Sequence, residues 1–492
     1  MTGGLERADR RAAASWSLAA LALYLATAAR GLVWADSSKL TVYALSSYFP
    51  TLNPGDHPGW TLLAGVWLRL AGGDPVVGAH RLSAVAGALA VGLLFLVLRS
   101  RGADRGRAHT ALALVLVALP VWWAATVAET YLPAVALALA GALALRCGAR
   151  GWRWPLAGAA FGLALACHAL ALFLVLPLLW EAERWRSWRA LPGAAAGAAP
   201  AWLAVFGAPA DPLTGFTAAG AATWRWHWEV FVALARVPRG LAGLAALLVY
   251  GVGALGAAAL WLGRREKRGS RVWTASLAVL ALLLAAYAPY RLHVMAAFLT
   301  VGALLALPAR LGAGGRAVHV LAQVVVYLSV PALLTVAGRQ GLGVRVLPGR
   351  NNAFYFLCPI KNAAWGRHLW PPSALFDPGA DAYVAGLGAC APPGAAVLAD
   401  FNAGAPLRLA QLARSWRRDL EVHPVAVDVA LASPEPARAL EAEIRRELPR
   451  RPVVLADTYA PYYRPDELAA HLTVSPCRVG AVVGAGPTGG GP

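Results

Sequence analysis

Four ionisable side chains lie within 22 residues of one another in a chain dominated by Ala, Leu, Val and Trp: Asp36, Lys39, Asp56 and His57. They occupy the first polar connection after the first hydrophobic run. A carboxylate here could act as a general base that takes a proton from a hydroxyl group. Charged groups beside a bilayer are costly to desolvate, so a cluster at one helix end favours a functional site. An ordinary solvated loop is an equally good interpretation of the spacing.

Two further residues could complete such a site. Glu129 lies in Ala-Glu-Thr-Tyr-Leu-Pro, at the predicted outer junction of two hydrophobic runs, and could flank one site with Asp36 although 93 residues separate them. His168 interrupts the hydrophobic run 155–180. Each has a structural alternative: Asp36 can cap the following helix, Glu129 can cap a helix or form a turn, and His168 can be hydrogen-bonded within the fold.

Cations at predicted helix ends on the same side suit a lipid-linked phosphate, because charge-assisted hydrogen bonds to phosphate are strong. Taken singly, each is better explained as an anchor to lipid headgroups. The segment His57-Pro-Gly can equally be a simple turn. The candidate phosphate ligands are Lys39, Arg81, Arg291 and His293.

Composition indicates a polytopic membrane protein. The chain has 492 residues, of which 59% are hydrophobic and only 14% charged, and its mean hydropathy is +0.55. The net charge of +19 could suggest nucleic acid, but the excess lies in residues 1–337, with 28 Lys and Arg against 12 Asp and Glu. In that part Lys and Arg set membrane topology, so no nucleic-acid partner is expected.

Charge also decides the predicted topology. If the run 155–180 turns back near His168, the basic segments 181–186 and 264–268 both fall inside, and the cytoplasmic segments hold 20 Lys and Arg against about six in the external connections. We therefore predict eleven membrane segments, with the N-terminus in the cytoplasm as an uncleaved anchor. The loop 36–77 and the tail lie outside, and 58–72 forms an interfacial helix. The other runs are 14–35, 78–98, 108–126, 130–146, 192–208, 239–262, 272–289, 292–309 and 317–337.

Residues 338–492 differ in kind and predict a small extracytoplasmic α/β domain. Strands are expected at 395–400, 420–428 and 452–457, and helices at 405–417 and 434–448. This alternation predicts a parallel sheet. The segment 338–380 is rich in loop-forming residues, and 483–492 is a disordered Gly and Pro end. Asp400 and Asp457 end two of the strands, where open sheets bind ligands, but a helix cap explains an Asp there equally well.

Several classes of site have no support in the sequence. The five cysteines are too scattered for a zinc site or a disulfide framework, and at most one disulfide of unreadable pairing is possible among Cys358, Cys390 and Cys477. No P-loop, dinucleotide-binding glycine motif or hydrolase nucleophile motif occurs. No metal or cofactor is required by the residues.

The chain contains five short motifs: Asp36-Ser-Ser, Asp56-His-Pro-Gly, Arg81-Leu-Ser-Ala, Ala128-Glu-Thr-Tyr and Gly162-Leu-Ala-Leu-Ala-Cys-His-Ala-Leu. The tail adds Pro-Pro-Gly-Ala-Ala-Val-Leu-Ala-Asp400 and Ala405-Pro-Leu-Arg-Leu-Ala-Gln411. In this order and spacing, the motifs resemble those of the GT-C glycosyltransferases. The resemblance is to a multi-pass family that includes the animal protein O-mannosyltransferase acting on plexin-type immunoglobulin-like domains, with bacterial relatives.

The resemblance implies a sugar donor carried on polyprenyl phosphate and a site on the outer face of the cytoplasmic membrane of a bacterium. Asp36 would deprotonate or orient the hydroxyl of a protein or glycan acceptor. His57 and Glu129 match positions of the family and would bind substrate. Our hypothesis adds Asp56 and His168 as substrate ligands and the four cations as phosphate ligands. This chain departs from the family in having an added Asp56 and His-Pro-Gly-Trp60 where relatives have His-Pro-Pro-Gly, and Cys-His168 where they have Asn-His.

Two functions from other classes stay open. A transporter or flippase for lipid-linked glycans would need polar groups along a path across the bilayer, and the predicted segments have essentially no acidic residue at their centres. A non-catalytic scaffold in envelope assembly would use the tail to bind a partner.

Overall fold

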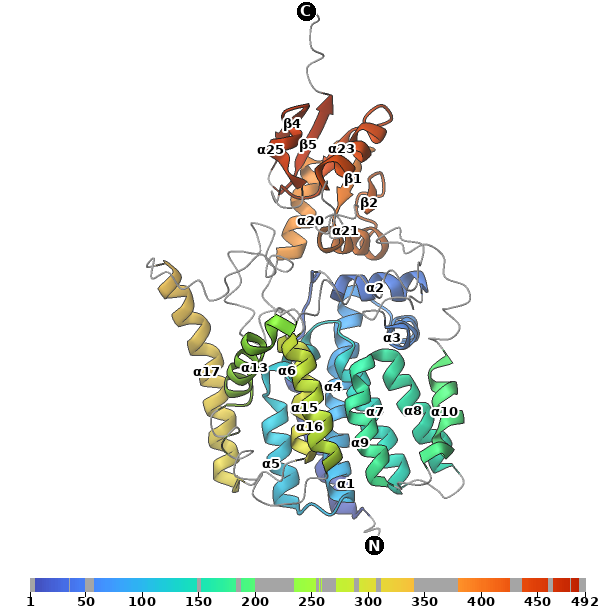
Figure 1. Cartoon of the computed structure of the whole chain (residues 1–492), viewed down its shortest axis with the longest axis vertical. Helices are drawn as coiled ribbons and strands as arrows, with labels where there is room; N and C mark the ends of the chain where they lie inside the picture. Colours follow the sequence, from blue (N-terminus) through green and yellow to red (C-terminus); the bar gives the residue numbers. More distant parts are fainter. Residues whose placement is uncertain are drawn as a thin grey trace, which may run out of the picture.

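The computed structural model describes residues 5–34, 36–48, 57–147, 152–182, 187–199, 234–253, 256, 258, 271–286, 292–306, 311–339, 379–424, 436–458, 463–477 and 479–485. A bundle of helices with the N-terminus and a tail with a β-sheet are stacked along the long axis (Figure 1). The two parts meet where α2 (Asp36–Ser46) packs against α21 (Phe401–Arg414).

The bundle is organised around α4 (Pro75–Ser100), which packs against α1 (Arg7–Thr27) and α7 (Tyr131–Cys147). The side chain of Asp74 caps α4 by accepting a hydrogen bond from the Val76 amide at 2.8 Å, and Pro75 occupies the first turn, where no amide hydrogen is needed. Apolar side chains then follow on every face, and most of the helix is buried. The bundle also contains α10 (Leu191–Gly197), α16 (Leu292–Ala306), α17 (Ala313–Arg339) and the short η2 (Ser187–Ala190).

The prediction of a GT-C-like bundle of eleven membrane segments is wrong for the residues that the structure describes. Two stretches are long and apolar enough to cross a membrane: α4, and Leu234–Val252, which joins η3 (Leu234–Arg236) to α13 (Val237–Val252). A third is reached only if α5 (Arg105–Leu116) and α6 (Leu119–Thr126), bent by 58° at their junction, form one span.

Several helices are bent or too short to cross, which explains this difference. The run 108–126 breaks after Leu116, and Pro120 lies in the first turn of α6. The runs 130–146 and 272–289 form α7, of 17 residues, and α15 (Arg271–Ala286), of 16. A straight crossing needs about 20 residues. Hydropathy thus shows where each apolar run begins and ends, but not where the helix within it ends or bends.

The run 155–180 does turn back at His168, as the charge pattern predicts. It forms α8 (Arg153–Cys167), η1 (Ala169–Ala171) and α9 (Leu172–Ala182). Glu181, at the end of α9, lies 3.5 Å from Arg146 at the end of α7, only seven residues before α8 begins. The chain therefore leaves that end of the bundle along α8 and returns to it along α9.

Two helices lie across the other end of the bundle, α2 and α3 (Pro58–Ala71) (Figure 1). The helix predicted at 58–72 is therefore present. Leu62, Val66 and Leu70, spaced four residues apart, are all exposed and form one apolar stripe along α3.

The tail contains a five-stranded sheet in the order β2-β1-β3-β5-β4. Its first three strands lie where the sequence predicts them and run parallel, but β5 is antiparallel to both β3 and β4, so the predicted parallel sheet is corrected to a mixed one. β5 also enters the predicted disordered end. The strands are β1 (Ala396–Ala399), β2 (Glu421–Pro424), β3 (Val453–Leu455), β4 (Leu472–Pro476) and β5 (Ala481–Ala485).

Helices and one disulfide complete the tail. α23 (Pro436–Glu447) lies within the predicted helix 434–448, whereas α21 overlaps the predicted helix 405–417 but begins at Phe401. α20 (Gly379–Cys390) and α25 (Pro465–Leu468) are additional. Cys390, at the end of α20, is bonded to Cys477, which follows β4. Cys358 and nearly all of the predicted loop-rich segment 338–380 lie outside the described residues.

The core of the tail extends into the first loop of the bundle. Leu32 and Trp34 are buried in the same apolar cluster as Tyr383 of α20 and the strands β1 and β3. The Trp34 and Tyr383 rings lie 4.9 Å apart, and Val42, Tyr43 and Val76 join the same cluster. The first loop thus folds as part of the tail as well as part of the bundle.

Candidate functional site

The first loop, residues 28–34, lies beside the loop 127–130 that carries Glu129. The Ala29 amide donates a hydrogen bond to the carbonyl oxygen of Thr126 at 2.8 Å. His80 of α4 then joins the two loops, because its Nε2 lies 3.1 Å from the Gly31 carbonyl oxygen and its Nδ1 accepts from the Ala128 amide at 2.9 Å. Segments nearly 100 residues apart in sequence are thereby held side by side.

These contacts fix the protonation of His80. Because Nδ1 accepts from an N–H group, the ring proton of the neutral imidazole lies on Nε2 and is donated to Gly31. The side chain is only 2% exposed, so both ring nitrogens are satisfied within the protein. His80 therefore acts as a fixed strut between the loop that leads to Asp36 and the loop that carries Glu129.

Ser83, one turn after His80 on the same face of α4, holds the backbone of Glu129. The Glu129 amide donates to Ser83 Oγ at 3.1 Å, and Ser83 Oγ donates to the Glu129 carbonyl oxygen at 3.3 Å. The Glu129 side chain is half-buried. Its backbone is thus set by α4, most of which is buried.

Asp36 is half-buried in the first turn of α2, where its negative charge interacts favourably with the amide end of the helix. The capping position itself, residue 35, lies outside the described residues. The approach to Asp36 is held by the tail, since the Leu32 amide donates to Asp381 Oδ2 of α20 at 3.0 Å. Asp381 is in turn bound by Arg414 of α21 at 2.6 Å. The tail therefore positions the loop that delivers Asp36.

His57 stacks on His168, with ring centroids 4.9 Å apart and planes inclined by 27°. Tyr131 and Phe298 lie 4.8 and 5.4 Å from the His168 ring, and we refer to these four side chains as the histidine–aromatic cluster. His168 Nδ1 also accepts from the Leu170 amide at 3.1 Å and so caps η1, which is the structural role weighed for it above. Tyr131 begins α7 two residues after Glu129, so the cluster adjoins the Glu129 loop.

Gly59 explains how His57 reaches His168. A Cβ atom at Gly59 would lie 2.7 Å from the backbone of Ala166 and Cys167, at the end of α8. Only glycine allows α3 to approach α8 this closely. The His57-Pro-Gly segment therefore begins α3 and packs against the end of α8, where the chain turns back.

The predicted phosphate ligands are only partly described. Lys39 lies one turn after Asp36 on α2, with its Nζ 5.5 Å from the centre of the Tyr43 ring. Arg81 follows His80 directly and is exposed. Asp56, Arg291 and the side chain of His293 lie outside the described residues.

Sequence reasoning missed His80, Ser83 and Tyr131. All three lie within or next to motifs singled out for their neighbours, Arg81 and Glu129. One feature of the sequence points to His80: it lies one residue before Arg81, in the first turns of a long apolar helix. A histidine ring buried there must find hydrogen-bond partners within the protein.

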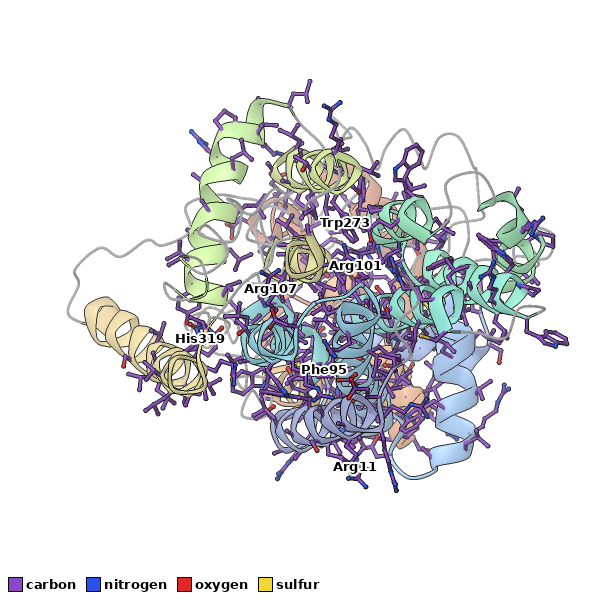
Figure 2. All side chains as sticks on the ribbon, turned by 90° about the horizontal axis from the view of Figure 1, so that it is seen from below. Arg11, Phe95, Arg101, Arg107, Trp273 and His319 are labelled. Carbon is purple, nitrogen blue, oxygen red and sulfur yellow. A yellow bond between two sulfur atoms is a disulfide. The ribbon has the colours of Figure 1, made fainter. Side chains whose placement is uncertain are left out.

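Acidic residues at the opposite end of the bundle form ion pairs with arginines. Glu181 accepts hydrogen bonds from Arg101 at 2.8 Å and from the Trp273 indole at 2.7 Å, and Arg101 and Trp273 lie together between the helices in Figure 2. Burial would raise the pKa of Asp9, but hydrogen bonds from Arg99 and Arg105 lower it overall. These carboxylates already have cationic partners and hold helices together.

The two strand-ending aspartates of the tail are buried. Asp400 accepts from the Tyr463 hydroxyl at 2.7 Å and from the Ala403 amide at 3.3 Å, so it caps α21, and Asp457 accepts from the Thr458 amide at 2.6 Å. Burial, followed by the charge of Asp400, raises the pKa of Tyr463 well above its usual value. Asp400 thus has the capping role expected as the alternative to ligand binding.

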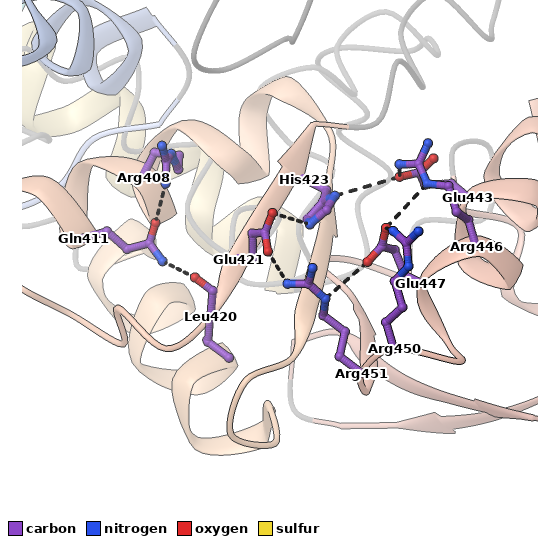
Figure 3. Close-up of polar contacts among 10 residues, drawn as sticks. All are labelled: Arg408, Gln411, Leu420, Glu421, His423, Glu443, Arg446, Glu447, Arg450 and Arg451. Atoms are coloured by element: carbon purple, nitrogen blue, oxygen red, sulfur yellow. Dashed lines mark hydrogen bonds and ion pairs between the residues drawn. The ribbon is translucent and has the colours of Figure 1, made fainter.

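His423, Glu443 and Glu447 lie close enough to resemble a metal site, with candidate ligand atoms within 4.8 Å of one another (Figure 3). Three arginines already pair with these carboxylates: Arg446 with Glu443, Arg450 with Glu447 at 3.7 Å, and Arg451 with Glu447 at 3.2 Å. A hydrogen bond from Arg451 also lowers the pKa of Glu421. This group is best described as an ion-pair network that joins β2 to α23.

The chain matches no protein-family model and no curated protein.

Proposed function

We propose that this chain is a membrane glycosyltransferase that moves a sugar from a polyprenyl-phosphate donor to a hydroxyl group of a protein or glycan acceptor. The observation that carries the proposal is the junction made by His80, which holds the loop leading to Asp36 against the loop bearing Glu129. The motifs that resemble those of polyprenyl-phosphate glycosyltransferases fall on the elements of this junction: Asp36 on α2, Arg81 on α4 and Glu129 before α7.

Asp36 would take the proton of the acceptor hydroxyl while the oxygen of that hydroxyl forms a bond to C1 of the sugar. The bond between C1 and the phosphate oxygen breaks, and polyprenyl phosphate leaves with the electron pair. Lys39 lies three residues after Asp36 and so on the same face of α2, which would place a cation for the leaving phosphate beside the base. Glu129, His57 and His168 would orient the acceptor or the sugar, and Arg81 would bind the phosphate.

We further propose that the tail lies outside the cytoplasm and that α3 contacts the outer surface of a bacterial cytoplasmic membrane. The Cys390–Cys477 disulfide supports an oxidising compartment for the tail. The exposed apolar stripe of α3 suits the boundary between water and lipid. Arginines gathered at the opposite end of the bundle fit the cytoplasmic side: Arg7, Arg10, Arg11, Arg99, Arg101, Arg105 and Arg107.

The test is transfer of radiolabelled sugar from polyprenyl-phosphate donors in membranes that contain the wild type or Asp36→Asn. Protein, glycan and lipid fractions are counted separately, so the labelled fraction identifies the acceptor class. Loss of a general base should lower transfer by about 10²- to 10⁴-fold. The matched control is Asp466→Asn, which makes the same change at an exposed first-turn position of α25.

Undiminished transfer by a stably expressed Asp36→Asn protein would remove Asp36 from the reaction. If a well-folded wild type transfers no label from any donor, the glycosyltransferase proposal fails as a whole.

A further inference from the structure

Most of the tail arginines whose side chains the structure describes are paired with carboxylates. Nine have described side chains, and seven of these make ion pairs within 4 Å: Arg414, Arg417, Arg445, Arg446, Arg450, Arg451 and Arg464. Arg408 and Arg418 have no acidic partner among the described residues. Both line the same pocket of about 250 Å³, together with Gln411, Leu412 and Leu420.

Arg408 is oriented by a neutral group, which leaves its charge uncompensated. Its Nη1 donates to Gln411 Oε1 at 3.0 Å, and Gln411 Nε2 in turn donates to the Leu420 carbonyl at 2.8 Å (Figure 3). Gln411 is only 6% exposed, so it is a fixed support. The guanidinium is thus held in one orientation by a side chain that has no charge.

The Nε of Arg408 is buried and has no hydrogen-bond partner within the described part of the chain. Nε therefore has almost no surface open to a ligand, and what Arg408 offers the pocket is its uncompensated positive charge, to which an anion binds strongly. Arg418 is exposed at the same pocket and supplies the second positive charge.

We propose that this pocket binds a phosphate monoester. Two guanidinium groups without counter-ions match a doubly charged group, whereas a single carboxylate would neutralise only one of them. Leu412 and Leu420 form an apolar wall that suits the organic part of the ligand. The phosphate can come from the headgroup of a lipid or from a soluble phosphate. Asp36 does not line this pocket, so the inference does not depend on the proposed sugar transfer.

The test is calorimetric titration of the purified full chain in detergent micelles at constant ionic strength. One arm uses inorganic phosphate, and the other uses mixed micelles that contain phosphatidic acid, with phosphatidylcholine as the uncharged comparison. Saturable binding in either arm supports the site, and the arm that binds more tightly identifies the source. Arg418→Gln should weaken binding about tenfold, and Arg408→Gln combined with Arg418→Gln should abolish it.

Arg445→Gln is the matched control, because it removes one exposed arginine of the tail from the helix α23. It should bind as the wild type does. The proposal is overturned if the wild type binds neither probe saturably, or if Arg445→Gln weakens binding as much as Arg418→Gln. Arg418 is exposed, so its substitution tests the pocket even if the double variant fails to fold.

Discussion

His80 holds two loops with one neutral ring, and its role depends on being a donor and an acceptor at once. The Gly31 carbonyl oxygen receives its proton, and the Ala128 amide gives one. Few side chains can do both in a buried position. Glutamine can, because its amide has one end of each kind, whereas leucine matches the ring in approximate size but forms neither bond.

Replacing His80 with leucine should therefore separate the loops. The buried Ala128 amide loses its partner at a cost of about 1–3 kcal/mol, and the half-buried Gly31 carbonyl loses its own as well. The expected result is a lower thermal midpoint, measured on the purified chain in detergent. His80→Gln is the control and should recover most of the loss. If the leucine and glutamine variants melt alike, the hydrogen bonds of His80 do not hold this junction.

At the scale of elements, the contact between α3 and α8 depends on the absence of a single Cβ atom. Gly59 and Gly65 lie on the same helix but in different surroundings. A Cβ at Gly59 would meet backbone atoms at 2.7 Å, whereas at Gly65 the nearest atom is 3.5 Å away, which is an ordinary contact. The two positions therefore form a matched pair.

Gly59→Ala should push α3 away from α8 and cost about 1–3 kcal/mol of stability. Gly65→Ala should be neutral or slightly stabilising, because alanine favours a helix more than glycine does. Thermal unfolding of both variants checks this. The displacement should also separate His57 from His168, so a disulfide between cysteines placed at those two positions should form less readily in the Gly59→Ala background. Equal melting of the two alanine variants would contradict the close-contact explanation.

Some of these elements were predictable from sequence and others were not. The strands β1, β2 and β3 have short apolar runs that end at turn residues, and the turn at His168 follows from the distribution of basic residues. The eleven membrane segments failed because an apolar run does not show where its backbone bends, as at Leu116. The mixed sheet was missed because β4 is largely exposed and carries polar residues, and β5 runs into the Gly-rich end of the chain. His80 was missed because its partners are backbone groups far away in the sequence.

At the scale of the whole molecule, the tail is closed on itself by the Cys390–Cys477 bond, which links residues 87 apart. A crosslink over a loop of this length restricts the unfolded chain and typically contributes about 2–5 kcal/mol. α20 also carries Asp381 and Tyr383, which contact Leu32 and Trp34 of the loop 28–34. The disulfide therefore stabilises the helix that holds this loop.

Cys390→Ser should lower the thermal midpoint of the chain, and Cys477→Ser should lower it equally, because either change removes the same bond. Maleimide labelling before and after reduction checks that the bond exists in membranes. Cys147 is the internal control, since it is a free and exposed cysteine and should react without reduction. Labelling of both Cys390 and Cys477 in unreduced membranes would contradict the disulfide.

The hydrogen bond from the Leu32 amide to the Asp381 carboxylate joins residues that lie 349 positions apart in the chain. During synthesis, the segment that leads to Asp36 is made early but must wait for nearly the whole polypeptide before its partner exists. Until then Leu32 and Trp34 have no tail core in which to bury their side chains, and contacts between such distant residues form slowly. Folding of the loop 28–34 should therefore be a late, single event. A chain truncated before α20 should leave this loop unfolded.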